Sequence, residues 1–306
     1  MLSFIFRRLV VAIPTLFLVI TLAFFMMRAA PGSPFDSNQR MTPEVRANLE
    51  AKYGFDQPLH VQYARYIGGV VRGDFGPSLK YKTKSVADFI KEGFPTSLLI
   101  GGSALLFASL IGLSLGIWAA LRQNRVGDYL ATGVAILGVC IPTFVTAPLL
   151  ILFFASKLGW LPNGGVTAGL KSYILPITVL ALPQIAIISR LTRAGMIEVL
   201  RSNYVRTARA KGLPEHTVVF RHAIRAALIP LVSYLGPAAA GLITGSLVVE
   251  KLFGLPGLGK SFILGALQRD YTVVMGVVIL YAALILLLNL LADVVVALLD
   301  PRVRLS

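Results

Sequence analysis

The sequence predicts an all-α membrane protein with six transmembrane helices, and composition and patterning both lead to this prediction. Hydrophobic residues make up 56% of the 306-residue chain and charged residues only 14%, whereas a soluble domain carries roughly 25% charged residues. Long charge-free apolar stretches alternate with short basic ones. A bilayer core of ~30 Å requires about 20 apolar residues in helical form, and a helix satisfies its own backbone polar groups in lipid.

Six apolar stretches are long enough to be spans. They run over Leu9–Met27, Ser97–Leu121, Tyr129–Ser156, Tyr173–Ser189, Leu228–Val249 and Thr272–Leu299. The first five contain no Asp, Glu, Lys or Arg. The third holds Pro142 and Pro148 and the fourth Pro176 and Pro183, so we expect kinks there. In the sixth, Asp293 is expected to be solvated at the inner interface or paired with an Arg of the cytoplasmic 190–227 loop rather than functional.

The N-terminus has the parts of a signal peptide in the right order, with Arg7 and Arg8 before an apolar stretch and Ala29-Ala30 after it. The stretch is longer than the roughly 7–15 apolar residues of a typical signal peptide. We therefore expect an uncleaved first transmembrane helix.

Basic residues predict the orientation of the spans. Arg7, Arg8, Arg122, Arg125, all eight Lys and Arg between residues 190 and 227, and Arg302 and Arg304 fall on one side. The short loops of the other side hold fewer: Lys157, Lys171, Lys251, Lys260 and Arg269. By the positive-inside rule, both the N-terminus and the C-terminus are expected in the cytoplasm.

The long segment between the first two spans, residues 29–95, predicts a small external helical lobe. Thr42-Pro43-Glu44 has the cap and first-turn residues of a helix that stops at Gly54. A second helix is expected to begin at Pro58. Its apolar face carries Leu59, Tyr63, Tyr66, Ile67 and Val70.

The lobe is expected to end in a turn and a short helix. Residues 73–77 read Gly-Asp-Phe-Gly-Pro, which is typical of a turn, and Ser85 is a candidate cap for a third short helix. The lobe either packs on the outer ends of the spans or docks a partner.

Several features that could indicate another function, such as nucleic-acid or metal binding, do not support one here. A net charge of +15 would suggest nucleic-acid binding in a soluble protein, but here the charges flank apolar spans. Cys140 lies in an apolar stretch and is expected to be a buried, inert thiol. His60, His216 and His222 are not spaced as metal ligands.

The segment Gly254–Ser261 matches the phosphate-binding pattern G-x-x-x-x-G-K-[ST]. It joins two spans on the predicted external side, where ATP is scarce, and Pro256 removes one backbone N–H donor. We therefore expect a Gly/Pro-rich turn without bound nucleotide.

The loop at residues 190–227 is the informative one. It is rich in Lys and Arg, with Glu198 and Glu215 as its acids. Within it, Arg201–His216 predicts a helix, a turn at Gly212 and a second helix after Pro214. Ala208 and Ala210 would let this elbow seat closely in a groove of another protein. A basic linker lying on anionic lipid is the alternative.

The stretch from Tyr204 to Leu213 resembles the EAA loop of the permease subunits of ABC importers, in the peptide and nickel branch. The general pattern is Glu-Ala-Ala, three residues and Gly, followed later by Ile-x-Leu-Pro. Here Arg206-Thr207-Ala208 replaces Glu-Ala-Ala, as is typical of the peptide branch, and Gly212 matches. Leu228-Ile229-Pro230 approximates the end of the pattern.

Other segments resemble the same branch across the whole chain, and the similarity is greatest to the B-type subunit of oligopeptide importers. These segments are Arg7-Arg8 with Ile13-Pro14-Thr15, Ala30-Pro31-Gly32-Ser33-Pro34, residues 73–78, residues 253–259 and Asp300-Pro301.

The resemblance implies the type I ABC importer permease fold, with residues 1–28 as first span, 29–95 as lobe and 96–306 as five-helix core. It implies a non-catalytic permease of the bacterial inner membrane that imports peptides with a homologous second permease, two ATP-binding subunits and an external peptide-binding protein. ATP and magnesium would be used by the ATP-binding subunits, and no cofactor is expected on this chain. The residues it implies for coupling to the ATPases are Asn203, Tyr204, Val205, Arg206, Thr207, Ala208, Arg209, Ala210, Lys211 and Gly212.

Two alternatives remain from the sequence. One is an ion-coupled secondary carrier or channel, and the other, within the same family, is a dipeptide or nickel permease. Because a secondary carrier ordinarily has carboxylates or half-helix ends near the middle of the membrane, and neither is clear here, the driving force is expected to come from outside this chain. Peptide preference and the residues that line the path are beyond the sequence.

Overall fold

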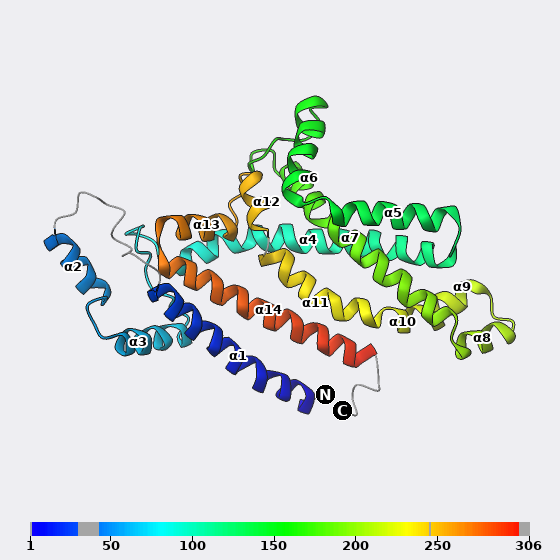
Figure 1. Ribbon diagram of the computed structural model, residues 1–306, viewed down its shortest axis with the longest axis horizontal. Coiled ribbons are helices and arrows are strands. Elements are labelled where there is room, and N and C mark those ends of the chain that lie inside the picture. Colours follow the sequence, from blue (N-terminus) through cyan, green and yellow to red (C-terminus); the bar gives the residue numbers. More distant parts are fainter. Residues whose placement is uncertain (1, 30–42, 245, 300–306) are drawn as a thin grey trace.

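The computed structural model describes residues 2–29, 43–244 and 246–299. Within them the chain is helical throughout its regular elements (Figure 1). These elements are α1 (Leu2–Ala29), α2 (Pro43–Tyr53), α3 (Leu59–Val71), α4 (Val86–Leu121), α5 (Val126–Cys140), α6 (Thr143–Leu150), the π-helical η1 (Ile151–Lys157), α7 (Lys171–Leu200), α8 (Asn203–Ala210), α9 (Glu215–Thr217), the π-helical η2 (Val218–Ala223), α10 (Ile224–Ala227), α11 (Ile229–Thr244), α12 (Leu247–Leu252), α13 (Leu258–Gln268) and α14 (Tyr271–Leu299).

The predicted spans correspond to long apolar helices of the structure. Within the part of the chain that the structure describes, five stretches are long and apolar enough to cross a membrane: Ile5–Ala29, Val86–Leu121, Lys171–Leu200, Ile229–Leu252 and Tyr271–Leu299. The pair formed by Val126–Cys140 and Thr143–Lys157 brings the number to six if it is one bent span. The fold class predicted from the sequence, a polytopic all-α protein, is confirmed.

The third predicted span is broken rather than kinked. The two halves of the bent pair differ in direction by 101°. Ile141, before Pro142, has extended backbone angles (φ −88°, ψ 116°), as a residue before proline prefers. Pro148 sits inside α6 without ending it. The break leaves Cys140 exposed, so the prediction of a buried thiol is wrong.

The helix bundle has two ends, which we call the lobe end and the elbow end. The lobe end carries α2, α3 and α13, and the elbow end carries α8 and the turn between α4 and α5 (Figure 1). Asp293 near the elbow end of α14 pairs with Arg8 of α1, with 3.1 Å between Nη1 and Oδ2. The predicted pairing of Asp293 is confirmed, although its partner comes from α1 instead of the 190–227 loop.

Small residues let α4 and α7 approach closely. Gly112 and Gly116 of α4 face α7, and a methyl group on Gly116 would lie 2.6 Å from the carbonyl oxygen of Ser189. On Gly112 it would lie 2.7 Å from Cγ2 of Ile188. Helix association in lipid depends on such close packing, because lipid tails are as apolar as the side chains they replace.

The lobe packs on the end of α1. Tyr63 of α3 stacks on Phe25, with 5.5 Å between ring centroids, and meets Phe24 edge-on at 5.4 Å. Its hydroxyl lies 2.7 Å from the Thr21 hydroxyl. Arg28 lies 4.0 Å from the ring centroid of Phe55, a cation–π distance.

The turn after α3 ties the lobe to α14. Gly73 and Gly76 have φ of 76° and 87°, values that favour glycine. The next residue but one, Ser78, donates a hydrogen bond to the buried carboxylate of Asp270. Asp270 Oδ1 also accepts from the Leu79 amide at 3.1 Å. The predicted turn is confirmed.

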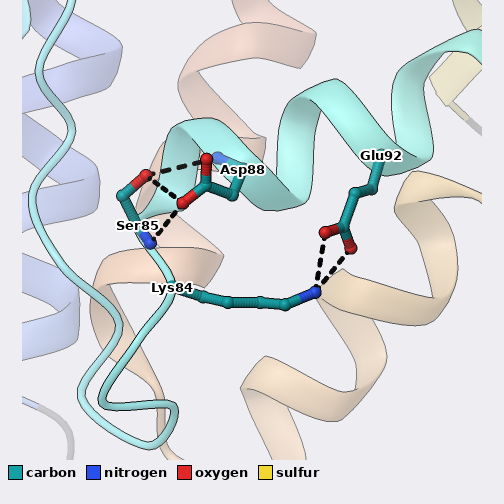
Figure 2. Close-up of polar contacts among 4 residues, drawn as sticks. All are labelled: Lys84, Ser85, Asp88 and Glu92. Atoms are coloured by element: carbon teal, nitrogen blue, oxygen red, sulfur yellow. Dashed lines mark hydrogen bonds and ion pairs between the residues drawn. The ribbon is translucent and has the colours of Figure 1, made fainter.

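Ser85 caps a helix, but not a short one. Its hydroxyl and amide exchange hydrogen bonds with Asp88 in a capping box, and Lys84 pairs with Glu92 one turn further on at 2.7 Å (Figure 2). The helix then continues for 36 residues as α4, so the prediction of a separate third helix is wrong. Pro95 lies inside this helix without ending it. Thr42 and the segments 30–34 and 300–301, singled out by the sequence, lie outside the described residues.

Replacing Gly116 by alanine is expected to lower the melting temperature of the full chain in detergent, because the added methyl group meets the α7 backbone. Overpacking of this kind costs about 1–3 kcal/mol. Gly102→Ala on the same helix is the matched control, since no atom lies within 4 Å of its new methyl group. Equal melting temperatures for the two variants would contradict the close α4–α7 contact.

Candidate functional site

The residues that the sequence predicted for coupling form the elbow, which we define as residues 203–212. They comprise α8 and the turn after it, at the extreme of the elbow end (Figure 1). Gly212 has a φ of 76°. Its amide donates to the Arg209 carbonyl at 2.9 Å, and the Leu213 amide donates to Ala208. These bonds are those of a glycine-terminated helix end, so the predicted helix, turn and stop are confirmed.

One side of α8 is committed to internal packing. Val205 is fully buried and Ala208 nearly so, and both contact Val218 of η2 together with the last residues of α7. Ala208 therefore serves the fit between α8 and its own chain. The prediction that Ala208 helps the elbow to enter a groove of another protein is wrong for this residue, while Ala210 is exposed.

The other side of α8 is exposed and basic. The exposed members of the predicted set are Asn203, Tyr204, Arg206, Thr207, Arg209, Ala210, Lys211 and Gly212. Leu213 and Phe220 add exposed apolar surface beside them. The elbow thus presents cations, an aromatic ring and apolar side chains on one protruding surface.

An ion pair closes the elbow. Arg209 Nη2 lies 2.6 Å from Glu215 Oε1, and Nε lies 3.1 Å from Oε2. The hydrogen bonds from Arg209 lower the pKa of the Glu215 carboxyl, and those to Glu215 raise the pKa of Arg209. Because the native pKa of Glu215 is lowered, its stabilising contribution is present above the unfolded value, near 4.3, and is lost as the pH falls through the native pKa.

A part-buried ion pair joins α5 to α7. Asp128 of α5 is 2% exposed, and Arg193 of α7 meets it with both Nε (2.5 Å) and Nη2 (2.6 Å). Further along α7, Arg201 donates to Gln123 at 3.1 Å. The sequence analysis missed Asp128, and the available signal was an acid at the start of a span in an acid-poor chain.

The segment that matches the phosphate-binding pattern holds an anion of its own. The loop leads into the N-terminus of α13, and the Gly259 amide there donates to Oε2 of the fully buried Glu250 at 2.8 Å. Ser97 of α4 donates to Oε1 at 2.6 Å, and Ser246 also donates to it. A methyl group on Gly257 would lie 2.2 Å from this carboxylate, so the glycines make room for Glu250. The sequence analysis did not single out Glu250.

A polar pair also links two of the membrane helices. Gln184 accepts a hydrogen bond from the Tyr234 hydroxyl at 2.6 Å, which ties α7 to α11. Across residues 2–29, 43–244 and 246–299, no three His, Cys, Asp or Glu side chains are placed to hold a metal ion.

Two family models match the chain. The model described as binding-protein-dependent transport system inner membrane component matches residues 112–305, and the model for the N-terminal part of such membrane components matches residues 1–100.

Curated relatives match over nearly the whole length. The chain is 53% identical over 305 residues to the oligopeptide transport system permease protein OppB of Salmonella typhimurium, covering 99% of this chain and 100% of the relative. It is 43% identical over 291 residues to the dipeptide transport system permease protein DppB of Bacillus subtilis, covering 95% and 94%.

Solved structures share the fold at low sequence identity. An inward-facing structure of the MetNI methionine ABC transporter matches with a TM-score of 0.57 and 19% identity, covering 68% of this chain and 94% of that one. An amino acid ABC transporter crystallised with histidines matches with a TM-score of 0.51 and 18% identity, covering 70% and 93%.

Replacing Glu215 by glutamine is expected to speed trypsin cleavage in the elbow, because Arg206, Arg209 and Lys211 are exposed and the pair that closes the elbow is lost. Exposed ion pairs contribute about 0.2–1 kcal/mol, so the initial rate should rise by up to roughly fivefold. The exposed Glu198→Gln serves as the control. Cleavage of both variants at the wild-type rate would show that the pair does not hold the elbow closed.

Replacing Glu250 by glutamine is expected to lower the melting temperature of the full chain. Glutamine keeps one acceptor oxygen and replaces the other with an NH2 group, which cannot accept the hydrogen bonds that this oxygen received from Gly259 or from the serines. A buried donor without a partner costs about 1–3 kcal/mol. Glu92→Gln is the control, since Glu92 forms an exposed pair with Lys84. A variant at position 250 as stable as the variant at position 92 would contradict the role given to this carboxylate.

Proposed function

This chain belongs to the family of binding-protein-dependent transport system inner membrane components, and from that premise we propose that it is the permease subunit of an ATP-driven importer of oligopeptides. The observation that carries the proposal is the 53% identity to an oligopeptide permease over 99% of the chain. Dipeptide permeases match at lower identity, which favours oligopeptides over dipeptides within the family.

The proposed orientation has the elbow end in the cytoplasm and the lobe end outside. The elbow, the α4–α5 turn with its arginines and the start of α1 with Arg7 and Arg8 lie toward the same end (Figure 1). Short basic segments are retained on the cytoplasmic side of bacterial membranes. Both termini are therefore proposed to be cytoplasmic.

The elbow is the proposed contact with the ATP-binding subunits. Its exposed cations, Tyr204 and the neighbouring Leu213 offer a protruding surface of mixed polarity, which a lipid-bound linker would not need in this folded form. The proposed complex has a homologous second permease, two ATP-binding subunits that use ATP and magnesium, and an external peptide-binding protein.

The packing of α8 would allow a displacement of α8 to be transmitted to the membrane helices. Val205 and Ala208 seat α8 on the end of α7, and the Arg193–Asp128 pair ties α7 to α5. A displacement of α8 by closing ATPases would therefore move both helices together and favour one of the inward- and outward-open states.

An ion-coupled carrier is the rival reading. The broken span at Pro142 is a feature that such carriers use to bind ions. The residues at this break, Cys140 to Thr143, carry no charge. The carboxylates Asp128, Glu250 and Asp293 all have partners, so none of the three is a vacant cation site.

Purification of the chain with its partners in mild detergent tests the proposal. We expect a second permease and ATP-binding subunits to co-purify, and a complex in liposomes to import a labelled oligopeptide only with ATP and the binding protein. A chain that transports alone, driven by an ion gradient, would overturn the proposal.

Replacing Gly212 by valine is expected to reduce peptide-stimulated ATP hydrolysis by roughly fivefold or more, because a β-branched residue at positive φ is strained by about 1–3 kcal/mol. Within this chain no atom lies within 4 Å of a Cβ at this position, so the cost to the elbow itself is backbone strain. Asn, which tolerates this conformation, provides the control Gly212→Asn. Normal coupling in a correctly inserted Gly212→Val complex would exclude the elbow as the coupling element.

A further inference from the structure

A groove with a volume of about 500 Å³ lies between α1 and α14, which run side by side toward the elbow end (Figure 1). Each helix contributes one stripe of side chains to its wall. The lining residues are Arg7, Arg8, Val11, Ala12 and Thr15 of α1 and Leu286, Asn289, Leu290 and Asp293 of α14. From Arg8 and from Leu286 onward the residues recur every three or four positions, so each stripe follows one face of its helix.

The end of the groove nearest the elbow end is charged. Arg8 and Asp293 meet across it, with 3.1 Å between Nη1 and Oδ2, and Arg7 lies beside Arg8 in the lining. These groups are accessible, because 52% of the Arg8 side chain and 31% of the Asp293 side chain are exposed. Among the residues that line the groove, two arginines against one carboxylate give an excess of one positive charge.

The groove becomes apolar with distance from this charged end. Thr15 lies seven residues from Arg8, which is about 10 Å along the helix axis. The Thr15 hydroxyl donates to the Val11 carbonyl of its own helix at 2.8 Å, and Leu286 and Leu290 form the opposite wall. Val11 is 65% exposed, so this part is open to the surroundings of the bundle, which are acyl chains in a membrane.

We propose that this groove holds one anionic phospholipid, with its phosphodiester on Arg7 and Arg8 and its glycerol backbone along the apolar part. Guanidinium groups bind phosphate through charge-assisted hydrogen bonds, and basic pockets between transmembrane helices bind anionic headgroups. The excess of one positive charge matches a lipid with one phosphate. The inference does not depend on the proposed peptide transport.

The shape of the groove favours a lipid over free phosphate. A free ion would use only the charged end, whereas a lipid also covers the apolar part that continues from it. The volume falls within the roughly 300–1,000 Å³ of small-ligand sites. This space suits a headgroup and its glycerol backbone, while the acyl chains remain in the bilayer.

Native mass spectrometry of the full chain in mild detergent measures the affinity for added phosphatidylglycerol. For Arg7→Gln we expect a loss of about fivefold, the effect of one cation near an anionic lipid. Arg125→Gln is the matched control. It removes the same charge from an exposed residue of the α4–α5 turn, outside the groove. Zwitterionic phosphatidylethanolamine should bind more weakly than phosphatidylglycerol to the wild-type chain.

Asp293→Asn is expected to change the affinity in the opposite direction. It removes the carboxylate that repels the phosphate and competes for Arg8, so phosphatidylglycerol should bind more tightly, by about fivefold for one unit of charge. The melting temperature measured without lipid reports separately on the lost ion pair between α1 and α14. A purely structural role of Arg8 and Asp293 would give no tighter binding.

Ala12→Phe tests the apolar part of the groove without changing its charge. The added ring should fill the groove and weaken the binding of phosphatidylglycerol, whereas the binding of inorganic phosphate should not change. Ile13→Phe is the control, because Ile13 is exposed and does not line the groove.

The inference is overturned if Arg7→Gln and Arg125→Gln bind phosphatidylglycerol equally well, or if phosphatidylethanolamine binds the wild-type chain as tightly. Inorganic phosphate that displaces the lipid at equal concentration, with no effect of Ala12→Phe, would also overturn it by leaving only an ion site. None of these measurements involves transport, so a failure of the proposed function would leave their outcome unchanged.

Discussion

The small-residue face of α4 is the constraint on which the rest of the structure depends. Gly93, Gly101, Gly112 and Gly116 lie along this face, and each lets another element reach the helix backbone. A methyl group on Gly93 would meet α13, and one on Gly101 would meet α11 at 2.9 Å, while Gly112 and Gly116 face α7. With no hydrophobic drive between helices in lipid, these close contacts fix where α7, α11 and α13 lie against α4.

Much of this arrangement could be predicted from local pattern. Apolar length located the spans, because crossing a bilayer demands it regardless of what each helix touches. Gly212 predicted the end of α8, since a left-handed residue there needs glycine. Pro58 predicted the start of α3 for a similar local reason. Such signals lie within a few residues of the feature that they determine.

The remainder depends on pairs far apart in the sequence. Asp128 meets Arg193 across 65 positions, and Ser97 meets Glu250 across 153, so neither pair has a local signature. Pro142 predicted a bend, but its angle of 101° depends on the neighbours of both halves. The phosphate-binding pattern at residues 254–261 is the clearest case. Its glycines do form an anion-binding helix N-terminus, and only the fold shows that the anion is the chain's own carboxylate.

The positions and partners of the carboxylates Asp128, Asp293 and Glu250 bear on how a peptide could cross the membrane. Asp128 and Asp293 pair with arginines toward the elbow end, and Glu250 is enclosed by hydroxyl and amide donors near the lobe end. Each of these three carboxylates thus has its partners near an end of the bundle. A single unpaired charge in the middle of the membrane would instead cost several kcal/mol. A neutral middle attracts neither acidic nor basic side chains strongly. In the proposed importer, such a path would suit peptides of varied sequence, with selection left to the proposed peptide-binding protein and the driving force to the proposed ATP-binding subunits.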